Sequence, residues 1–414
     1  MIAPLDLTAV LNRYRHELFG SVVPFWLQHA VDHQHGGLHS CIGDDGVVQS
    51  TDKYMWSQLR GLWTFSALYN RMQGSAARHE GWLGQAGTDP QAWLDVAHGI
   101  YRFVSQHGQD EQGRWVFARH GDGSPHTGYT SIYTDGFALL GLTEYARATG
   151  NQDALASALA TFKRVRALLA APGSYPSDPY PLPEGVQAHG VAMIFSLAFF
   201  ELALLSGQAD VMNAALEEAD KVMGLFRRPR QRYVLEFLDA SGEPMDSPRG
   251  RAIVPGHAIE SMWFMLHIYQ HVGNEQRMAE AIECIRWHTE LGWDAEHGGL
   301  LLARDAAGGE AWWPFADSKL WWPQTEAMYA LLLAHELSGE AWCLDWFRRV
   351  DEYAFAHYPV PQHGEWTQRL DRYGRKFTET VALPVKDPFH LPRALLLSVE
   401  VLERLTGEQG AAEL

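Results

Sequence analysis

Short segments rich in Gly, Asp and His recur along this chain, and their spacing limits the fold more than any other feature. Each precedes an aromatic or aliphatic run; they are HQHGGLHS from His33, DEQGRWVF from Asp110, RPRQRYVLEF from Arg228, AEHGGLLL from Ala295 and PQHGEWTQ from Pro361. The interval between the second and the third is much longer than the others, and GSYP from Gly173 divides it. About six units of roughly 60 to 75 residues therefore fit the chain, and a period of this length indicates a repeated supersecondary unit.

Between these segments, apolar residues recur at the three-and-four spacing that is typical of amphipathic helices. The periodicity predicts helices over residues 7–19, 54–71, 91–107, 133–149, 153–169, 191–206, 211–226, 257–271, 275–290, 321–337, 341–357 and 391–406. Strand signals are short and few, at residues 37–41, 114–117, 233–237, 299–302 and 364–367.

A pair of helices joined by a short loop and repeated six times closes into a ring of inner and outer helices. We therefore predict an all-α fold: a single (α/α)6 barrel over residues 1–414, with about twelve helices and short β-hairpin-like connections. No linker rich in Pro, Ser and Gly divides the sequence. A superhelical array of helix pairs is the competing architecture, but such arrays usually have shorter repeats.

The composition limits the binding partners and the cell compartment that we expect for this chain. The chain has 33 Lys and Arg against 50 Asp and Glu, a formal net charge of −17, so neither nucleic acid nor an anionic membrane is an expected partner. Three scattered cysteines form no disulfide or metal pattern and suit a reducing cytoplasm, where we expect this protein. No signal peptide is visible, and the longest apolar run, Val191 to Phe200, is too short to span a membrane.

The aromatic and histidine content is high, with 16 Trp, 15 Tyr, 18 Phe and 20 His. Aromatic rings stack on the C–H faces of sugars and imidazoles titrate near neutral pH, although a large helical core also uses such residues. Phosphate-loop, dinucleotide, zinc-ligand and serine-nucleophile motifs are absent from the sequence. We therefore expect no nucleotide cofactor and no metal.

Polar residues stand at the start of several apolar helices. In IVPGHAIESMW, His257 follows a Pro-Gly turn at a predicted helix N-terminus, and Glu260 lies one turn further on the same face. The helix terminus disfavours the imidazolium and the carboxylate favours it, so the pair can hold a pKa near neutrality, where a general base works best. The alternative is a helix cap with a solvated His–Glu pair.

A second histidine has the same relation to the last helix. In PVKDPFHLPR, His390 precedes the apolar run and Arg393 follows one turn later. Because loops at one end of a closed ring converge on its axis, His257 and His390 are expected to face each other across a central cavity. His189 occupies a similar place before another helix, where the spacing alone favours a satisfied histidine in the core.

Two further segments suit sugar binding. In KYMWSQLRGLW, the spacing places Trp56, Arg60 and Trp63 on one helix face, and Arg60 needs acceptors such as sugar oxygens or a core carboxylate. In KLWWPQTE, two adjacent indoles, Trp321 and Trp322, precede Glu326 by about one turn. This second pattern is typical of a stacking platform beside a hydroxyl acceptor, although neighbouring indoles also pack in cores.

Taken together, these segments resemble the N-acylglucosamine 2-epimerase family, which also contains cellobiose 2-epimerases and mannose isomerases. The resemblance runs nearly from end to end, through FWLQHAVDHQHGGLHSCIGDDG from Phe25, DKYMWSQLRGLWTF from Asp52, PGHAIESMWF from Pro255, GWDAEHGGL from Gly292, KLWWPQTEAMYA from Lys319, HGEWTQRLDRYG from His363 and PFHLPRA from Pro388. The family folds as an (α/α)6 barrel, in agreement with the repeat.

The resemblance implies that His257 and His390 are the acid–base pair and that Glu260 orients His257. It also implies a set of substrate-binding residues: Arg60, Tyr54, His189, Trp321, Trp322, Glu326 and Phe389. One imidazole removes the C2 proton of a ring-opened aldose, and Arg60 stabilises the enediolate. Return of a proton to the opposite face of C2 gives the 2-epimer, whereas protonation at C1 gives a ketose. No cofactor or metal is implied, and the partner is a small sugar.

Some positions depart from the family pattern. His189 is similar to an additional histidine of cellobiose epimerases and mannose isomerases, and Asp387 and Pro388 stand where the animal N-acylglucosamine epimerases have Gly and Cys. The stretch from Gly173 to Gly185 is expected to form a loop over the mouth of the cavity. The leading hypothesis is interconversion of N-acylglucosamine and N-acylmannosamine, with a mannose or cellobiose enzyme as the alternative.

Other classes of protein fit parts of the pattern. Many (α/α)6 barrels are glycoside hydrolases that use two carboxylates, and Asp135, Glu260 and Glu326 are candidates for such a pair. A binding protein without catalysis is a third hypothesis, because animal members of the family also bind a protease. Aromatic residues on the outer helices are consistent with a homodimer.

Substitution of the two histidines separates the epimerase from the hydrolase. His257→Asn and His390→Asn are each expected to abolish exchange of the sugar C2 proton with solvent, because an amide does not act as a general base. Proton NMR in D₂O measures that exchange. A hydrolase acting through carboxylates keeps its glycosidase activity in both variants, which contradicts the epimerase hypothesis.

Overall fold

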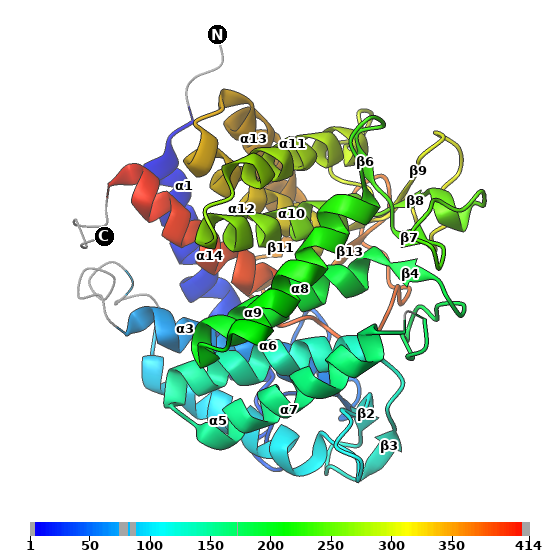
Figure 1. Ribbon diagram of the computed structural model, residues 1–414. Coiled ribbons are helices and arrows are strands. Elements are labelled where there is room, and N and C mark those ends of the chain that lie inside the picture. The colour runs from blue at the N-terminus through cyan, green and yellow to red at the C-terminus, as the bar shows by residue number, and fades with distance from the viewer. Residues whose placement is uncertain (1–4, 74–81, 83–87, 172, 408–414) are drawn as a thin grey trace.

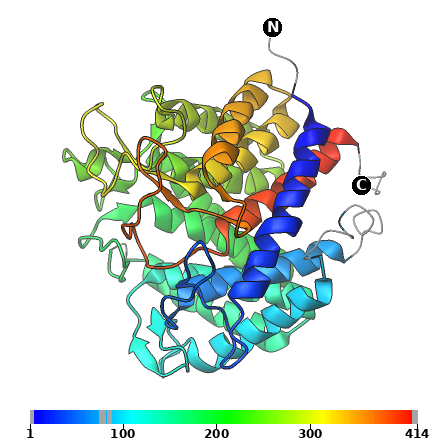
Figure 2. The same ribbon diagram turned by 180° about the vertical axis from the view of Figure 1, so that it is seen from behind.

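The computed structural model describes residues 5–73, 82, 88–171 and 173–407. Within these residues the helices form two concentric layers (Figures 1 and 2). The inner helices are α3 (Met55–Met72), α6 (Ile132–Thr149), α8 (His189–Ser206), α10 (Pro255–His271), α12 (Trp321–Ser338) and α14 (His390–Thr406). The outer helices are α1 (Leu7–Arg15), α2 (Val23–His29), α5 (Pro90–His107), α7 (Gln152–Leu169), α9 (Ala209–Lys221), α11 (Glu275–Gly292) and α13 (Ala341–His357).

The inner helices close into a ring. Each packs against the next, and α14 packs back onto α3, while every inner helix also packs against an outer helix. The N-terminal helix α1 lies beside α14, as Figures 1 and 2 both show, so the two ends of the chain complete one helix pair. The predicted (α/α)6 barrel is confirmed, because all the predicted helices are present and, apart from the end of the first, their ends agree within a few residues.

The first helix is longer than predicted. The periodicity predicts that it ends at residue 19. In the structure, a π-helical segment, His16–Val22, joins α1 to α2, and the continuous helical rod ends at His29. Pro24 lies in the first turn of α2, directly after the π-helical segment. A second π-helical segment, Val222–Phe226, extends α9.

Short antiparallel strands join the N-terminal ends of neighbouring inner helices. The pairs are β1 (Lys53–Tyr54) with β2 (Ala118–Arg119) and β3 (Pro125–Thr127), β4 (Gln187–Ala188) with β7 (Phe237–Leu238), β8 (Ala252–Ile253) with β9 (Arg304–Asp305), and β10 (Lys319–Leu320) with β13 (Arg369–Leu370). Two further hairpins, β5 (Arg227–Arg228) with β6 (Tyr233–Val234) and β11 (Pro359–Val360) with β12 (Glu365–Trp366), lie at the ends of outer helices. These pairs gather the long connections at one end of the ring.

Some predicted strands are wrong. Residues 37–41, 114–117 and 299–302 contain only isolated bridges, at Leu38, Trp115 and Leu300. The preceding glycines turn the chain too tightly for a ladder, as at Gly298 and Gly299, which have φ values of 71° and 76°. The predictions at 233–237 and 364–367 overlap β6, β7 and β12.

A buried lysine fixes the connection before α3. The Nζ atom of Lys53 donates to Asp32 Oδ2 at 2.6 Å and to the carbonyls of Gly36 and Gly121. Burial alone would raise the pKa of Asp32, but the hydrogen bond from Lys53 and two backbone N–H groups hold that pKa below its ordinary value. One turn into α3, Gln58 pairs with both backbone groups of Leu38.

The same arrangement recurs before α12. There Lys319 Nζ lies 3.0 Å from Asp294 Oδ2, and Gln324 pairs with both backbone groups of Leu300. The two copies occupy the repeated DHQHGG and DAEHGG segments. The repeat seen in the sequence therefore encodes one loop structure, which sets the start of an inner helix twice.

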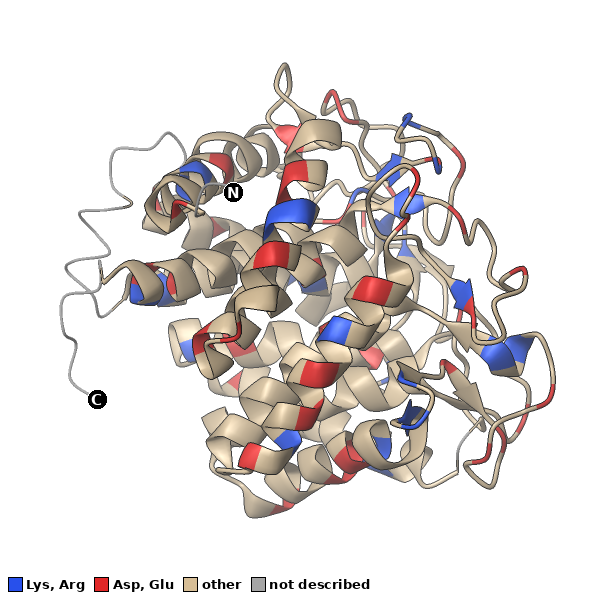
Figure 3. Ribbon diagram, turned by 90° about the horizontal axis from the view of Figure 1, so that it is seen from above, with Lys and Arg blue, Asp and Glu red and all other residues tan. Residues whose placement is uncertain are grey.

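The inner helices are apolar on nearly every face. Helix α8 is long and apolar enough, by length and composition, to cross a membrane, but 78% of that stretch is buried inside the barrel. The predicted buried run over residues 191–200 lies in this helix. Charged residues of both signs occur along the outer helices and the connecting loops (Figure 3).

Removal of the Lys53 cation should destabilise the fold. Lys53→Met leaves Asp32 buried without its partner, which costs about 3–5 kcal/mol in the free energy of unfolding. Urea and thermal denaturation measure this loss. Lys163→Met, at an exposed position on α7, is the matched control and should stay close to the wild type. Equal stability of the two variants would contradict a structural role for the buried pair.

Candidate active site

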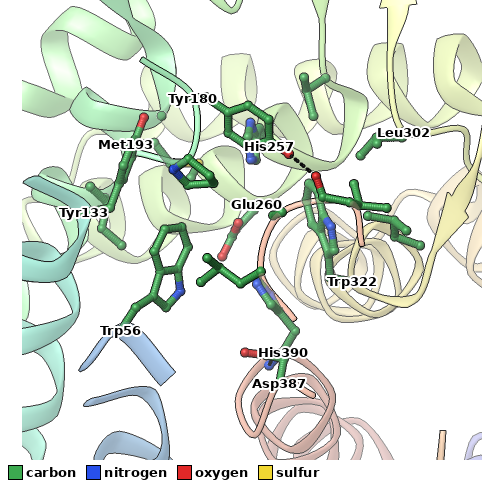
Figure 4. Close-up of a pocket in the computed structure, with 18 of the residues that line it drawn as sticks. Trp56, Tyr133, Tyr180, Met193, His257, Glu260, Leu302, Trp322, Asp387 and His390 are labelled. Atoms are coloured by element: carbon green, nitrogen blue, oxygen red, sulfur yellow. Dashed lines mark hydrogen bonds between the residues drawn. The ribbon is translucent and has the colours of Figure 1, made fainter. Parts of the chain in front are cut away.

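A cavity of about 190 Å³ opens at the end of the ring where the inner helices begin. Its walls come from the first turns of these helices and from the loops above them, as Figure 4 shows. The residues from the inner helices are Trp56, Ser57, Arg60, Tyr133, Phe137, Gly190, Met193, Ile194, His257, Glu260, Trp321, Trp322 and His390. Most of the lining is apolar or aromatic, and its polar groups are concentrated around two histidines.

His257 is the third residue of α10 and keeps 26% of its side chain exposed to the cavity. Its Nδ1 lies 3.0 Å from Oε1 of Glu236, a buried residue between β6 and β7. Burial alone would lower the pKa of His257, but the charge and hydrogen bond of Glu236 raise it above its ordinary value. Burial would raise the pKa of Glu236, yet the two histidines beside it, His257 and His189, lower that pKa to about 2.

His390 is the first residue of α14 and is held from both sides. Its Nδ1 lies 2.7 Å from Glu326 Oε1, and its Nε2 lies 3.2 Å from the Arg60 guanidinium. Asp387 Oδ2 accepts the backbone N–H of His390 at 2.8 Å. Carboxylates accept and guanidinium groups donate, so the neutral ring carries its proton on Nδ1 and its lone pair on Nε2.

Arg60 is placed by a carboxylate as well as by aromatic faces. Its NH1 donates to Asp387 Oδ1 at 2.8 Å, and its guanidinium lies 4.2 Å from the centre of the Phe137 ring. Burial lowers the pKa of Arg60 and Asp387 opposes that effect. For Asp387, burial would raise the pKa, but the Arg60 charge holds it below its ordinary value. The ion pair with Asp387 uses NH1 of Arg60 and leaves NH2 facing the cavity beside His390.

Arg393 joins two carboxylates beneath the cavity. Its NH2 donates to Glu260 and, at 2.7 Å, to Glu326 Oε1. Burial would lower the pKa of Arg393, but the two carboxylates raise it. In turn, Arg393 and His390 lower the pKa of Glu326. Glu260, Glu326 and His390 lie close enough together to bind a metal, but the guanidinium already supplies the cation between the carboxylates. This cluster is better suited to fixing His390 than to binding a metal.

Both histidines lie close to one indole. The Trp322 ring stacks on His257 with centroids 5.1 Å apart, and its centroid is 5.6 Å from that of His390. A side-chain carbon at Gly256 would lie 2.5 Å from Trp322, so only glycine allows this indole to pack against the start of α10. Figure 4 shows His257 and Glu260 of α10 and His390 of α14 around one space.

The structure brings together six of the predicted site residues at the cavity wall: His257, His390, Glu260, Arg60, Trp321 and Trp322. The predicted role of Glu260 is wrong, because its carboxylate binds Arg393 and the partner of His257 is Glu236. Glu326 is also not in the lining: it lies buried behind His390 and accepts the indole N–H of Trp263.

Three other predicted substrate-binding residues lie outside the cavity lining. Phe389 is 1% exposed and packs edge-on against Trp63 and Phe137 below Arg60. His189 is fully buried between Ser261 and Glu236, in agreement with the interpretation as a core histidine. Tyr54 belongs to β1 and packs edge-on against Phe117, outside the cavity lining.

Sequence reasoning missed Glu236 and the function of Asp387. Glu236 is the single carboxylate in the apolar segment YVLEF, and a charged residue in such a segment is a signal of a buried partner. Nothing in the sequence identified that partner, His257, which lies 21 residues later in the first turn of α10. The sequence marks Asp387 only as a departure from the animal epimerases, whereas in the structure it positions both Arg60 and His390.

Two loops approach each other over the cavity. Pro179, Tyr180 and Leu182 line it from one side, and the segment 381–383 lines it from the other. The Tyr180 hydroxyl donates to the carbonyl of Val381 at 3.1 Å, the contact dashed in Figure 4. The predicted loop over the cavity mouth is therefore present.

Comparison with known proteins identifies the family of this chain. The family model described as N-acylglucosamine 2-epimerase (GlcNAc 2-epimerase) matches residues 36–394. The N-acylglucosamine 2-epimerase of Bos taurus is 30% identical over 411 residues, which cover 96% of this chain and 92% of the relative. The chain belongs to the N-acylglucosamine 2-epimerase family. It is accordingly an enzyme of the isomerase class, a sugar epimerase.

More distant members of the N-acylglucosamine 2-epimerase family are also similar. The cellobiose 2-epimerase of Bacteroides fragilis is 23% identical, over 84% of this chain and 88% of that protein. A structure of cellobiose 2-epimerase from Bacillus thermoamylovorans has a TM-score of 0.80 at 20% identity and covers 95% of this chain and 99% of its own. These structural similarities support the barrel fold.

The barrel is shared with glycoside hydrolases. A family 76 mannosidase from Bacteroides thetaiotaomicron has a TM-score of 0.59 at 11% identity, covering 96% of this chain and 100% of its own. The predicted hydrolase carboxylates do not meet in the cavity: Asp135 is fully buried against Arg164, and Glu326 lies behind His390. The family assignment and the geometry both favour the epimerase.

Glu236 should control the pKa of His257 in this family member. In Glu236→Gln, loss of the neighbouring charge should lower the pKa of His257 by about 1–3 units, so the ring loses its proton at a lower pH. NMR titration of the histidine rings measures the change, with His257→Asn identifying the signal. Glu352→Gln, on the exposed face of α13, is the control. An unchanged His257 titration would contradict the assigned pairing.

Proposed function

We propose that this epimerase interconverts N-acylglucosamine and N-acylmannosamine by moving the C2 proton between His257 and His390, without a redox cofactor or metal. The observation that carries the proposal is the pair of histidines around one cavity, each with Nδ1 on a buried carboxylate. That contact directs the proton to Nδ1 and leaves Nε2 as the atom that exchanges a proton with the substrate.

The surroundings support unequal protonation of the two rings. Arg60 donates toward Nε2 of His390, so His390 is unprotonated there and suits the general base. Glu236 raises the pKa of His257, which therefore suits the general acid that returns a proton to the opposite face of C2. In the reverse direction the two rings exchange roles. Both carboxylates stabilise the imidazolium that each step forms.

Stabilisation of the enediolate is assigned to Arg60. Once Nε2 of His390 has taken the C2 proton, it no longer accepts from Arg60, and the guanidinium is free to donate to the negative oxygen of the intermediate. Asp387 keeps Arg60 in place during this exchange of partners. The negative charge of the enediolate therefore develops beside a guanidinium that is already oriented.

The N-acyl substrate is supported by the identity to the animal enzymes and by the cavity walls. Relatives named N-acylglucosamine 2-epimerase reach 30% identity, against 24% for those named cellobiose 2-epimerase. Met193, Ile194 and Leu302 add aliphatic surface, which suits the methyl group of an acyl chain. A mannose-type substrate is the second candidate, because a D-mannose isomerase has the same fold, with a TM-score of 0.77 at 16% identity over 97% of this chain and 100% of that chain. Cytoplasmic location and a homodimer stay predictions.

Proton NMR in D₂O tests the proposal. N-acetylmannosamine, N-acetylglucosamine, mannose, glucose and cellobiose are supplied separately, and the C2 proton signal is followed. We expect loss of this signal and appearance of the 2-epimer for the N-acetyl sugars, with turnover reduced by about 10²–10⁴-fold in His390→Asn. An unchanged thermal midpoint in that variant shows that the fold is intact.

The other outcomes are equally specific. Deuterium at C1 of a ketose formed from mannose would show that the enzyme catalyses an aldose–ketose isomerisation at the same histidines, and not an epimerisation. Exchange with mannose or cellobiose, but not with the N-acetyl sugars, would contradict the proposed substrate. Near-wild-type turnover in His390→Asn would contradict the mechanism.

A further inference from the structure

Two histidines and an aspartate lie together outside the cavity. Asp52 precedes β1, His120 follows β2, and His126 belongs to β3, so all three lie in or beside the sheet that leads into α3. His120 Nδ1 lies 2.9 Å from Asp52 Oδ1, and His126 Nε2 lies 3.9 Å from Asp52 Oδ2. The two imidazole rings are 4.7 Å apart between centroids. None of the three lines the cavity of the proposed reaction.

We propose that Asp52, His120 and His126 form a binding site for a divalent transition-metal ion of the zinc type. Two imidazole nitrogens and one carboxylate oxygen are ligands that Zn²⁺ prefers, whereas Mg²⁺ and Ca²⁺ take oxygen ligands. Three protein ligands leave one coordination position for water. The proposal rests on this donor set and its geometry, and it is independent of the sugar substrate.

The distances are close to those that a tetrahedral ion needs. Metal–ligand bonds of about 2.0–2.1 Å place neighbouring ligand atoms about 3.4 Å apart. One ligand atom from each residue can be chosen so that all three lie within 4.8 Å of one another. The side chains are 31%, 52% and 34% exposed for Asp52, His120 and His126. An ion can therefore enter from solvent, and small side-chain rotations close the site.

Neighbouring groups hold two of the ligands in place. Ser50 Oγ donates to Asp52 Oδ2 at 3.0 Å, and the hydrogen bond from His120 helps to keep the pKa of Asp52 below its ordinary value. Nδ1 of His126 shares a 2.7 Å hydrogen bond with Thr127 Oγ1. When Nδ1 is the donor, Nε2 carries the lone pair directed toward the site, as in many metal-binding histidines.

A bound ion would connect the β2–β3 hairpin to the residue before β1. Lys53, the next residue, is the buried lysine described above, and α3 then carries Trp56 and Arg60 to the cavity. The ion is therefore expected to stabilise this end of the barrel without contacting the reacting sugar. Sequence spacing did not reveal the site, because Asp52 and His120 are 68 residues apart.

Metal titration of the intact chain tests the site. After treatment with EDTA and its removal, isothermal titration with ZnCl₂ should show one tight site per chain, and saturation should raise the thermal midpoint by at least about 2 °C. Co²⁺ in place of Zn²⁺ should give the visible absorption of a four-coordinate ion. His120→Ala and His126→Ala should each weaken Zn²⁺ affinity by at least about tenfold.

The control is His363→Ala, which removes an exposed histidine from the turn between β11 and β12. It should leave the affinity unchanged. Thermal midpoints without metal show whether each variant is folded, and proton exchange at the sugar C2 is measured separately as the readout of the epimerase. Wild-type affinity in His120→Ala and His126→Ala, or equal loss in the control, would overturn the site. So would the absence of saturable binding, whatever the result with sugars.

Discussion

The ion pairs of Arg393 are the constraint on which the rest of the site depends. A single guanidinium on α14 binds Glu260 of α10 and Glu326 of α12, so three consecutive inner helices are joined where their first turns surround the cavity. Glu326 then holds His390 by Nδ1. Burial of two carboxylates is costly unless they are paired, and here the pairing also sets the direction of the imidazole. One guanidinium therefore both joins these three helices and fixes the carboxylate that places the candidate base.

The repeat places chemically different residues at equivalent positions. Arg60 and Glu326 each follow the buried lysine of their repeat, Lys53 or Lys319, by the same number of residues. Both then bind His390, one at Nε2 and the other at Nδ1. A single structural unit, used twice, thus provides the guanidinium and the carboxylate on opposite sides of one ring. Trp56 and Trp322 occupy equivalent positions in the same way, and both line the cavity.

The barrel by itself does not select the reaction, since sugar epimerases and glycoside hydrolases share it. In this chain each carboxylate at the cavity has a cationic or imidazole partner: Glu236 with His257, Glu260 with Arg393 and Asp387 with Arg60. A carboxyl group used as a general acid needs a raised pKa, and these surroundings lower the pKa of Glu236 and of Asp387. The electrostatics therefore favour imidazole chemistry.

The sequence by itself determined the helices, their closure into a barrel, and the histidines His257 and His390, because periodicity and the position before a helix are local features. Arg60, Trp321 and Trp322 followed from the same local pattern. Only the tertiary structure decided that Glu236, not Glu260, holds His257, and that Glu326 lies behind His390 and outside the lining. The reason is that tertiary packing sets the partner of a buried carboxylate: Glu236 meets His257 from 21 residues earlier in the chain, and Glu326 meets His390 from another repeat.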